Sequence, residues 1–440
     1  MRITRLKINN FRGIKKGELL FDAHVVLVGD NNSGKSTVLE AIDLVLGPER
    51  VSRRPIVDEH DFYAGEYKTA DGTPVEIIIE VLVTELSEEQ QRHFRDNLEF
   101  WDTKTNSIID SPPPEKTEDD TVIAAIRVGF RGYYDVEEDD FLGETYFLSP
   151  EPEDGKITPF RTSDKRECGF LFLRTLRTGS RALSLERGSL LDIILKLQEK
   201  RLQMWEDVLS SLRIIPVAEK PELGIKDTLV QIQEKIHSFV PSDWAGNPHI
   251  KVSDLTREHL RRTLTVFMDT GIQKEDGTEY AAPFQHQGTG MINMLVLSLL
   301  SMIADLKQNV IFAMEEPEIA IPPHTQKRIV ESVRDSSQAI FTSHSPYILE
   351  EFAPNEIIIL QRNAGDLTGH SCSLPPTVKM KSYKEQLRKR FCESLLARRI
   401  LITEGSTSSS LKLWILLLSG LCEICILPFV NCPCHTRMCP

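Results

Sequence analysis

The segment Gly29–Ser36 (GDNNSGKS) constrains this chain more than any other part of it. A short apolar run, His24–Val28, precedes the segment, and apolar residues recur at helical spacing from Val38 to Val45. Glycines allow a tight turn whose N–H groups face phosphate oxygens, while a lysine adds positive charge at the β and γ phosphates. The order strand, glycine-rich turn, lysine and helix therefore predicts a nucleotide-binding P-loop. A plain glycine-rich turn would leave Lys35 unexplained.

The helix that follows the P-loop is expected to end at Gly47–Pro48, because glycine and proline stop helices. The Ser36 hydroxyl is a candidate ligand for Mg²⁺. We predict nucleotide binding by Gly29, Asn31, Asn32, Ser33, Gly34, Lys35, Ser36 and Thr37.

Length and charge limit the class of protein. A chain of 440 residues with 40% hydrophobic residues can hold two or three folded domains and is not disordered. The net charge of −13 argues against wholesale coating of nucleic acid, although a local basic face could still bind a phosphate backbone. The N-terminal residues Met1–Ile8 alternate like a strand and lack the apolar core of a signal peptide, so we expect a cytoplasmic protein.

The pattern of apolar residues predicts an α/β fold. Four further strands are expected in a β-rich N-terminal lobe, at Ile3–Ile8, Gly17–Phe21, Val75–Val83 and Val122–Phe130. Proline and acidic residues in Thr103–Asp120 indicate an exposed loop. From Gly169 to about Thr270 the pattern turns helical without heptads, and this predicts a helical insertion. Asn309–Met314 and Gln338–Ser343 then have strand length and flank a crossover helix, which favours a parallel sheet.

A second motif follows the apolar run Val310–Met314, which ends in Glu315-Glu316-Pro317-Glu318. A strand that delivers carboxylates to the edge of a sheet suits phosphoryl transfer, which needs positioning and charge neutralisation. We assign Glu315 to the coordination sphere of Mg²⁺ and Glu316 to polarising the attacking water. A solvated acidic turn is the alternative for this segment alone, but the P-loop upstream favours catalysis.

Two further segments are candidates for contact with phosphate. Gln285–Gly290 (QHQGTG) opens an apolar helix, and the N–H groups and dipole at a helix N-terminus favour anions, so we include Gly288, Thr289 and Gly290 in the site. Alone, this turn would be a simple helix cap. His344, in Thr342-Ser-His344, follows an expected strand; a single histidine is more often structural, yet its place after the acidic strand favours a catalytic function.

Four motifs occur in the order found in ABC-type ATPases. Gly29–Ser36 resembles the Walker A motif of that class, and Gln287–Gly290 resembles the signature motif. Phe312–Glu318 resembles the Walker B motif, and Thr342–His344 resembles the His-switch motif. Asn9–Gly13 (NNFRG) resembles the opening of the RecF/SMC-like branch. Residues 1 to about 405 resemble the OLD (overcoming lysogenization defect) family of ATP-dependent endonucleases, in which such an ATPase precedes a Toprim nuclease domain.

The resemblance implies ATP and Mg²⁺ as cofactors, DNA as the target, and a role in DNA repair or phage defence. It implies a homodimer in which Lys35 and Ser36 of one protomer share ATP with Thr289 and Gly290 of the other. Glu316 would be the hydrolytic base, and His344 would contact the γ-phosphate region. The chain departs from the general pattern at Glu315, where aspartate is usual, and no glutamine is identified for the Mg²⁺-sensing loop.

The same resemblance divides the chain into five parts. These are an ATPase N-terminal lobe at 1–168, a helical insertion with dimer contacts at 169–275, an ATPase C-terminal lobe at 276–370, a basic linker helix at 371–399 and a Toprim segment at 400–440.

The Toprim segment is expected to be incomplete. Ile400–Thr403 followed by Glu404 resembles the first strand and Glu-Gly motif of that domain, so Glu404 is a candidate metal ligand. Toprim domains also use later acids, usually an Asp-x-Asp pair, to hold divalent metals for phosphodiester cleavage. No aspartate follows Asp366, and Glu423 is the one glutamate after Glu404. A truncated domain or an aberrant tail therefore fits the sequence best.

Two other interpretations of the tail remain open. Leu413–Val430 approaches the length of a membrane anchor, although it is short and contains Glu423, and we expect no membrane partner. A cluster of thiols and one imidazole near the C-terminus could bind Zn²⁺; it consists of Cys422, Cys425, Cys432, Cys434 and His435. The spacing of these residues does not fit a paired zinc-knuckle pattern. The basic run Lys379–Arg399 could bind phosphate or form a solvated helix face.

Two rival functions also remain open. One is a non-nucleolytic ATP switch that tethers DNA, like SMC or RecF proteins, and the absence of heptads counts against it. The other is an active endonuclease whose missing acids come from a partner chain.

Overall fold

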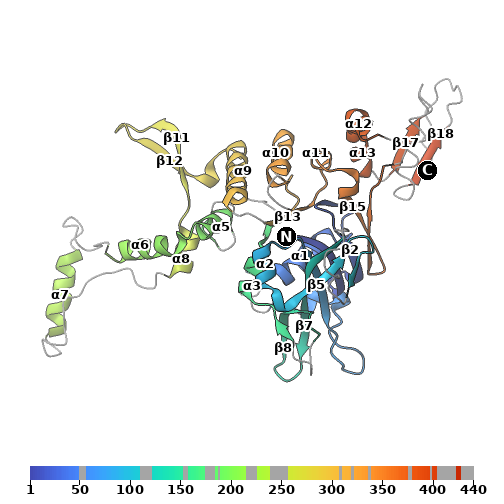
Figure 1. Ribbon diagram of the computed structural model, residues 1–440. Coiled ribbons are helices and arrows are strands. Elements are labelled where there is room, and N and C mark those ends of the chain that lie inside the picture. The colour runs from blue at the N-terminus through green and yellow to red at the C-terminus, as the bar shows by residue number, and fades with distance from the viewer. Residues whose placement is uncertain are drawn as a thin grey trace. The chain divides into compact units, whose positions relative to one another are not determined.

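The fold is described from a computed structural model. The description covers all residues except 49–55, 110–120, 152–156, 174–183, 187–188, 215–224, 238–255, 307–309, 319–321, 335–337, 375–378, 397–398, 404–422 and 428–440. The chain forms two compact units, Met1–Arg177 with Lys307–Pro440, and Thr178–Leu306 (Figure 1).

The first unit is built on one sheet with a parallel half and a mainly antiparallel half (Figure 1). The parallel half has the order β10 (Phe170–Leu173), β13 (Ile311–Glu315), β14 (Ala339–Thr342), β3 (His24–Val28) and β15 (Ile357–Asn363). The sheet continues through β16 (Asp366–Ser371), β2 (Ile14–Leu20), β1 (Arg2–Phe11), β4 (Ile77–Thr84), β7 (Val122–Asp135), β5 (Leu98–Asp102) and β6 (Ser107–Ile109). Strand β8 (Asp140–Phe147) pairs with β7 and with β9 (Thr158–Pro159).

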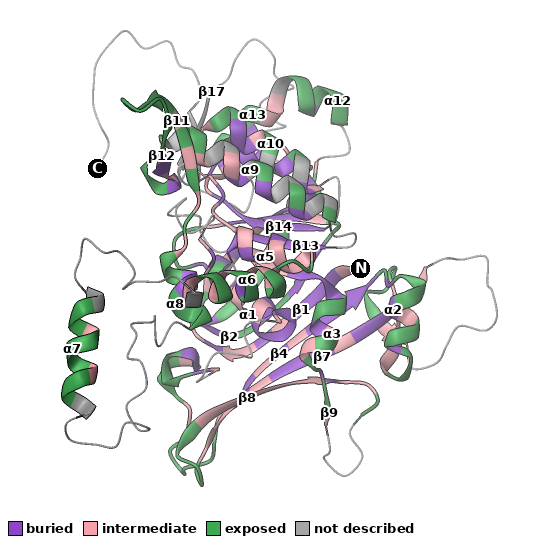
Figure 2. Cartoon of the chain, turned by 90° about the vertical axis from the view of Figure 1, so that its left-hand side faces the viewer, coloured by how far each residue is buried: buried purple, intermediate pink, exposed green. Residues whose placement is uncertain are grey.

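The parallel strands end at a common edge. Glu315 of β13 lies opposite Thr342 of β14, and Thr342 lies opposite Leu27 of β3. Strands β13 and β14 are almost entirely buried, as Figure 2 shows in purple, which fits the near-continuous apolar runs of a parallel sheet covered on both faces. The residues that follow β3, β13 and β14 are therefore brought to one edge.

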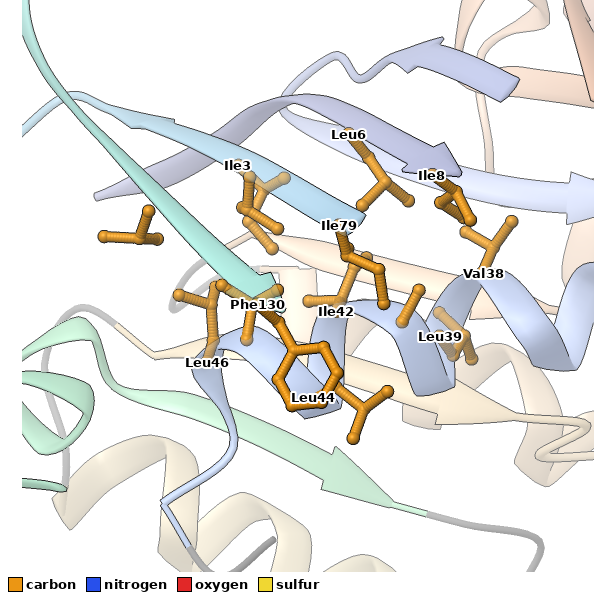
Figure 3. Close-up of a cluster of buried hydrophobic side chains, with 14 of the residues drawn as sticks. Ile3, Leu6, Ile8, Val38, Leu39, Ile42, Leu44, Leu46, Ile79 and Phe130 are labelled. Carbon is orange, nitrogen blue, oxygen red and sulfur yellow. The ribbon is translucent and has the colours of Figure 1, made fainter. Parts of the chain in front are cut away.

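Helix α1 (Lys35–Leu46) starts directly after the turn that follows β3. It ends where the Gly47 N–H donates to the Asp43 carbonyl, as the sequence predicts. Its apolar face packs against β1, β4 and β7 (Figure 3). The buried side chains of this cluster include Ile3, Leu6, Ile8, Val38, Leu39, Ile42, Leu44, Leu46, Ile79 and Phe130. Each fully buried side chain of this size contributes about 1.5–3 kcal/mol.

The first unit contains further helices. They are α2 (Glu88–His93), α3 (Thr162–Cys168), α10 (Pro323–Arg334), α11 (Pro346–Leu349), α12 (Met380–Ser382) and α13 (Arg388–Leu395). A π-helical turn, Tyr383–Leu387, joins α12 to α13, and α13 packs on α11. Strands β17 (Arg399–Thr403) and β18 (Glu423–Leu427) pair in parallel.

The second unit contains helices and one hairpin. The helices are α5 (Leu190–Leu197), α6 (Arg201–Ile214), α7 (Ile225–His237), α8 (Arg257–Thr263) and α9 (Thr289–Leu306). The hairpin pairs β11 (Phe267–Gln273) with β12 (Glu279–Pro283). Helix α5 contacts α9, and a small core is formed by Leu185, Trp205 and Leu260.

The structure confirms the predicted strands around the P-loop and the parallel crossover through α10, and it corrects three segments. Phe267–Gln273 lies within the predicted helical insertion but forms β11, because it pairs with β12 in a hairpin. Phe170–Leu173 lies within the stretch predicted to be helical but forms β10, because its apolar side chains pair in register with Ile311–Met314. Ser107–Ile109 lies within the predicted loop but forms β6 against β5. The rest of that loop, 110–120, lies outside the described residues.

Candidate nucleotide-binding site

The P-loop turn depends on glycine at two positions. Gly34 has a φ of 99°, a conformation that side-chain-bearing residues rarely adopt. A Cβ on Gly29 would lie 2.7 Å from the Leu360 carbonyl oxygen, so β15 leaves no room for a side chain there. The turn leads directly into α1, whose first turn has no acidic residue and no side-chain cap. Its free N–H groups and the helix dipole make this end of α1 suited to an anion.

Lys35 is the buried cation of the turn. Its side chain is 7% exposed, and its Nζ donates to the carbonyl oxygens of Gly29 at 2.8 Å and Asp30 at 3.0 Å. Burial lowers the pKa of Lys35, and the nearby carboxylates of Glu316, Asp30 and Glu318 oppose that shift. The ammonium is therefore held inside the loop by carbonyl groups that a phosphate could replace as partners.

The other predicted P-loop residues lie around this cation. Asn31 and Asn32 are exposed on the turn, and Thr37 is half-buried on α1. Ser33 is buried, and its Oγ has no hydrogen-bond partner among the residues that the structure describes.

Ser36 and Glu315 meet across the site. The Ser36 hydroxyl donates to the Glu315 carboxylate, so the start of α1 and the end of β13 are in direct contact. A hydroxyl and a carboxylate are hard oxygen donors, and Mg²⁺ is bound by oxygen donors of this kind together with phosphate and water. These two residues fit a magnesium ion.

Glu316 adopts a strained backbone conformation at the end of β13. Its φ is 44°, in the left-handed region. Its N–H donates to the Thr342 carbonyl at 3.0 Å and lies 3.2 Å from the Thr342 hydroxyl oxygen, which also accepts. These bonds from β14 fix the turn that carries the carboxylate.

His344 follows β14 at the same edge. Its backbone N–H donates to the Glu318 carboxylate at 2.6 Å. The ring Nε2 is buried and has no hydrogen-bond partner within the described part of the chain. A buried polar atom without a partner is rare in a folded protein and often marks a place that a ligand fills.

The predicted signature segment lies in the second unit, whereas the P-loop lies in the first. Phe284–His286 forms a 3-10 turn, and α9 begins at Thr289. Gly288 lies between them, and a Cβ added there would meet no atom within 4 Å. The structure thus places Thr289 and Gly290 in the first turn of a long helix.

Glu404, the candidate Toprim ligand, lies outside the described residues, as do Cys422, Cys432, Cys434 and His435. Among the residues that are described, no three His, Cys, Asp or Glu side chains are grouped to hold a metal. Glu423–Leu427, inside the stretch considered as a membrane anchor, forms strand β18.

Sequence reasoning left three residues at this edge without a function, namely Glu318, Thr342 and Ser343. Ser343 Oγ donates to Glu318 at 3.0 Å, and Thr342 fixes the Glu316 turn. Glu318 could have been singled out as the third acid after the buried strand. Nothing in the residue types of Thr342 or Ser343 distinguishes them from ordinary strand-end residues.

A glycine-rich turn that opens a helix, with carboxylates and a histidine on neighbouring strand ends, defines the class of P-loop nucleoside triphosphatases. Residues 1–138 and 185–349, more than half of the chain, match the family model of the AAA ATPase domain. The chain belongs to this AAA ATPase domain family, and it is a nucleotide-binding ATPase.

Several known proteins are similar to the chain. The OLD nuclease of Thermus scotoductus is 24% identical over an alignment of 434 residues that covers 92% of this chain and 71% of the relative. The DNA replication and repair protein RecF of Agrobacterium fabrum is 43% identical over 58 residues, 13% of this chain and 15% of RecF.

Similar solved structures include an SMC head bound to the C-terminal winged-helix domain of ScpA, at 15% identity and a TM-score of 0.45, covering 85% of this chain and 99% of that one. The SMC head domain of Thermotoga maritima matches at 12% identity and a TM-score of 0.38, covering 85% of this chain and 100% of that one. In the described parts of the chain, no helix has the length and apolar character needed to cross a membrane.

Proposed function

We propose that Glu316 is the general base of ATP hydrolysis, with Lys35 at the phosphates and His344 beside them. The observation that carries this proposal is the meeting of the α1 N-terminus with the end of β13, through the bond between Ser36 and Glu315. The end of β14 is joined to the same turn by the bonds from the Glu316 N–H to Thr342. Phosphoryl transfer depends on such positioning and on neutralising charge. The ring Nε2 of His344, which has no hydrogen-bond partner among the described residues, adds a donor or acceptor at the same edge.

Ser36 and Glu315 would hold Mg²⁺ when nucleotide is bound. The ion would supply charge neutralisation for the β and γ phosphates. Glutamate in place of aspartate lengthens the arm that carries the carboxylate but keeps its chemistry.

Two variants separate binding from hydrolysis. Lys35→Ala should lose nucleotide binding, because the buried ammonium is the positive charge of the turn. Glu316→Gln should keep binding and lose about 10²–10⁴-fold in turnover, the usual contribution of a general base. Glu331→Gln, which changes an exposed glutamate on α10, is the matched control and should change neither. Unchanged turnover in Glu316→Gln would refute the assignment.

We propose DNA as the partner, bound through the basic segment of α12 and α13. The exposed cations of this segment are Lys379, Lys381, Lys384, Lys389 and Arg390. None of them forms an ion pair within the part of the chain that the structure describes, although the whole chain carries a net charge of −13. Unpaired cations concentrated on a short helical segment suit a phosphate backbone.

We propose that residues 400–440 do not by themselves hold a two-metal nuclease site, because Glu423 is the one acid that follows Glu404 among them. The purified chain should not nick supercoiled plasmid in Mg²⁺ or Mn²⁺ while it hydrolyses ATP. Nicking that disappears in Glu404→Ala would instead favour an active endonuclease.

A further inference from the structure

Glu318 joins the two loops that carry the site residues. One carboxylate oxygen accepts from the His344 backbone N–H at 2.6 Å, and the other accepts from the Ser343 hydroxyl at 3.0 Å. The first bond is short and charge-assisted, which makes it stronger than a bond between neutral groups. Both oxygens of the Glu318 carboxylate thus accept hydrogen bonds from the loop after β14.

A second set of bonds holds the same loop from the side of α10. The Ser345 N–H donates to Ser343 Oγ at 3.0 Å, and the Ser345 hydroxyl bonds to Gln326 Oε1 at 2.6 Å. The Gln326 amide lies 3.5 Å from the Glu318 carbonyl oxygen, to which it donates. Ser343, Ser345 and Gln326 are buried, so water does not compete for these bonds.

The network fixes the backbone of His344 and leaves its ring available. The backbone N–H is bonded to Glu318, whereas the buried ring Nε2 has no partner among the described residues. The acids Glu315 and Glu318, at the end of β13 and just after it, thereby differ in their contacts. Glu315 meets Ser36 of α1, while Glu318 holds the loop after β14.

We propose that Glu318 is a positioning residue for ATP hydrolysis, which acts by holding the backbone of His344 so that its Nε2 stays at one place in the site. This inference rests on the proposed function, because it requires turnover at this site. Glu318 also lies near enough to Lys35 to act on its charge. An independent electrostatic function through Lys35 is therefore the competing explanation that the test must exclude.

A double-mutant cycle tests the proposal, with kcat, KM and nucleotide affinity measured for Glu318→Ala, His344→Ala and the double variant. Glu318→Ala should lower kcat by about 10–100-fold, the usual effect of removing a group that orients a functional side chain. Nucleotide affinity should change by less than about threefold, because the P-loop is intact. The double variant should be no slower than His344→Ala, since residues that act through one another are not additive.

Three further variants control for loss of structure. Glu356→Ala removes a buried carboxylate that likewise accepts from a backbone N–H, at 2.7 Å, and that pairs with Arg334 at 2.9 Å; it should leave kcat unchanged. Glu318→Gln keeps one acceptor oxygen for the His344 N–H but loses the charge and the second acceptor oxygen, so its kcat should lie between wild type and Glu318→Ala. If Glu318→Ala does not fold, Ser343→Ala removes one of the two bonds and should lower kcat less, in the same cycle with His344→Ala.

Some outcomes would overturn the inference. Independent losses that multiply in the double variant, or weaker nucleotide binding with unchanged kcat, would assign Glu318 to Lys35 or to the nucleotide itself. Such a result leaves the proposed function standing as long as Glu316→Gln abolishes turnover in the wild-type background. A wild-type chain without ATP hydrolysis would overturn both.

Discussion

At the residue scale, Glu316 combines a functional position with backbone strain. A residue other than glycine at a φ of 44° costs about 1–3 kcal/mol, and asparagine tolerates this region better than glutamate. We expect Glu316→Asn to increase the free energy of unfolding by about 0.5–1 kcal/mol and to lose ATP turnover. Chemical denaturation measures the first effect. Glu331→Asn on α10 is the control and should be slightly destabilising, because asparagine is a weaker helix former.

Lys165 is a buried cation outside the site. Its side chain is 0% exposed, and its Nζ donates to the Leu44 carbonyl at 3.4 Å, near the end of α1. Burial lowers the pKa of Lys165 to about 8, and the carboxylate of Asp43 opposes this shift. The free energy of unfolding therefore depends on pH through the protonation of Lys165.

The sign of this effect follows from proton binding. Between pH 8 and the ordinary lysine pKa of 10.5, the unfolded chain binds a proton that the folded chain has lost. Stability therefore rises with pH in this window, by at most about 1.4 kcal/mol per pH unit. Lys165→Met should lack this rise, and its stability advantage over wild type should shrink from pH 7 to pH 10. Denaturation curves of both proteins at these pH values test it; a constant difference would contradict the expected pKa.

At the scale of elements, α1 supports the site through its buried face. Leu39→Ala should cost about 2–5 kcal/mol of stability, because Leu39 is fully buried in the cluster shown in Figure 3. Leu20→Ala makes the same chemical change on β2 at a side chain that is 45% exposed, and it should cost less than about 1 kcal/mol. Similar losses in the two variants would contradict the core assignment.

The sequence predicts elements best where local pattern and burial agree. Strand β3 and helix α1 combine an apolar run, a glycine turn and helical spacing, so their bounds follow from the residues alone. Strand β8 (Asp140–Phe147) was not predicted, because it is half-buried with an exposed first residue and its pairing with β7 depends on tertiary contacts. For the same reason the continuity of the parallel and antiparallel halves in one sheet could not be predicted.

The candidate site shows the same limit. Lys35, Ser36 and Glu315 lie within motifs whose order indicates their chemistry, and the structure brings Ser36 and Glu315 into contact. The bonds that Glu318 accepts from Ser343 and His344 join the segments that follow two different strands, β13 and β14. Contacts of that kind depend on the register of β13 and β14, which a single sequence does not encode in a visible pattern.

At the scale of the whole molecule, the charge distribution makes a prediction for DNA binding. Each lysine that contacts a phosphate contributes about 1 to the slope of log affinity against log salt. Replacing Lys384 and Lys389 with alanine should weaken binding and lower this slope by about 2. The control pair Lys15 and Lys16, exposed on β2, carries the same charge change and should leave the slope unchanged. Fluorescence anisotropy at several salt concentrations measures it, and equal effects of the two pairs would exclude the basic segment as the DNA surface.

The last prediction concerns the sharing of ATP between two protomers, which the resemblance to ABC-type ATPases implies. Gly288→Arg should fold normally, because a Cβ there meets no atom within 4 Å, yet it should block a partner that closes over this turn. Neither Lys35→Ala nor Gly288→Arg should hydrolyse ATP alone. When mixed, they should recover turnover, since a heterodimer pairs the intact P-loop of one protomer with the intact signature turn of the other. Sedimentation of Glu316→Gln with ATP, but not ADP, should show the dimer. Full activity of Gly288→Arg as a monomer would mean that one protomer hydrolyses ATP by itself.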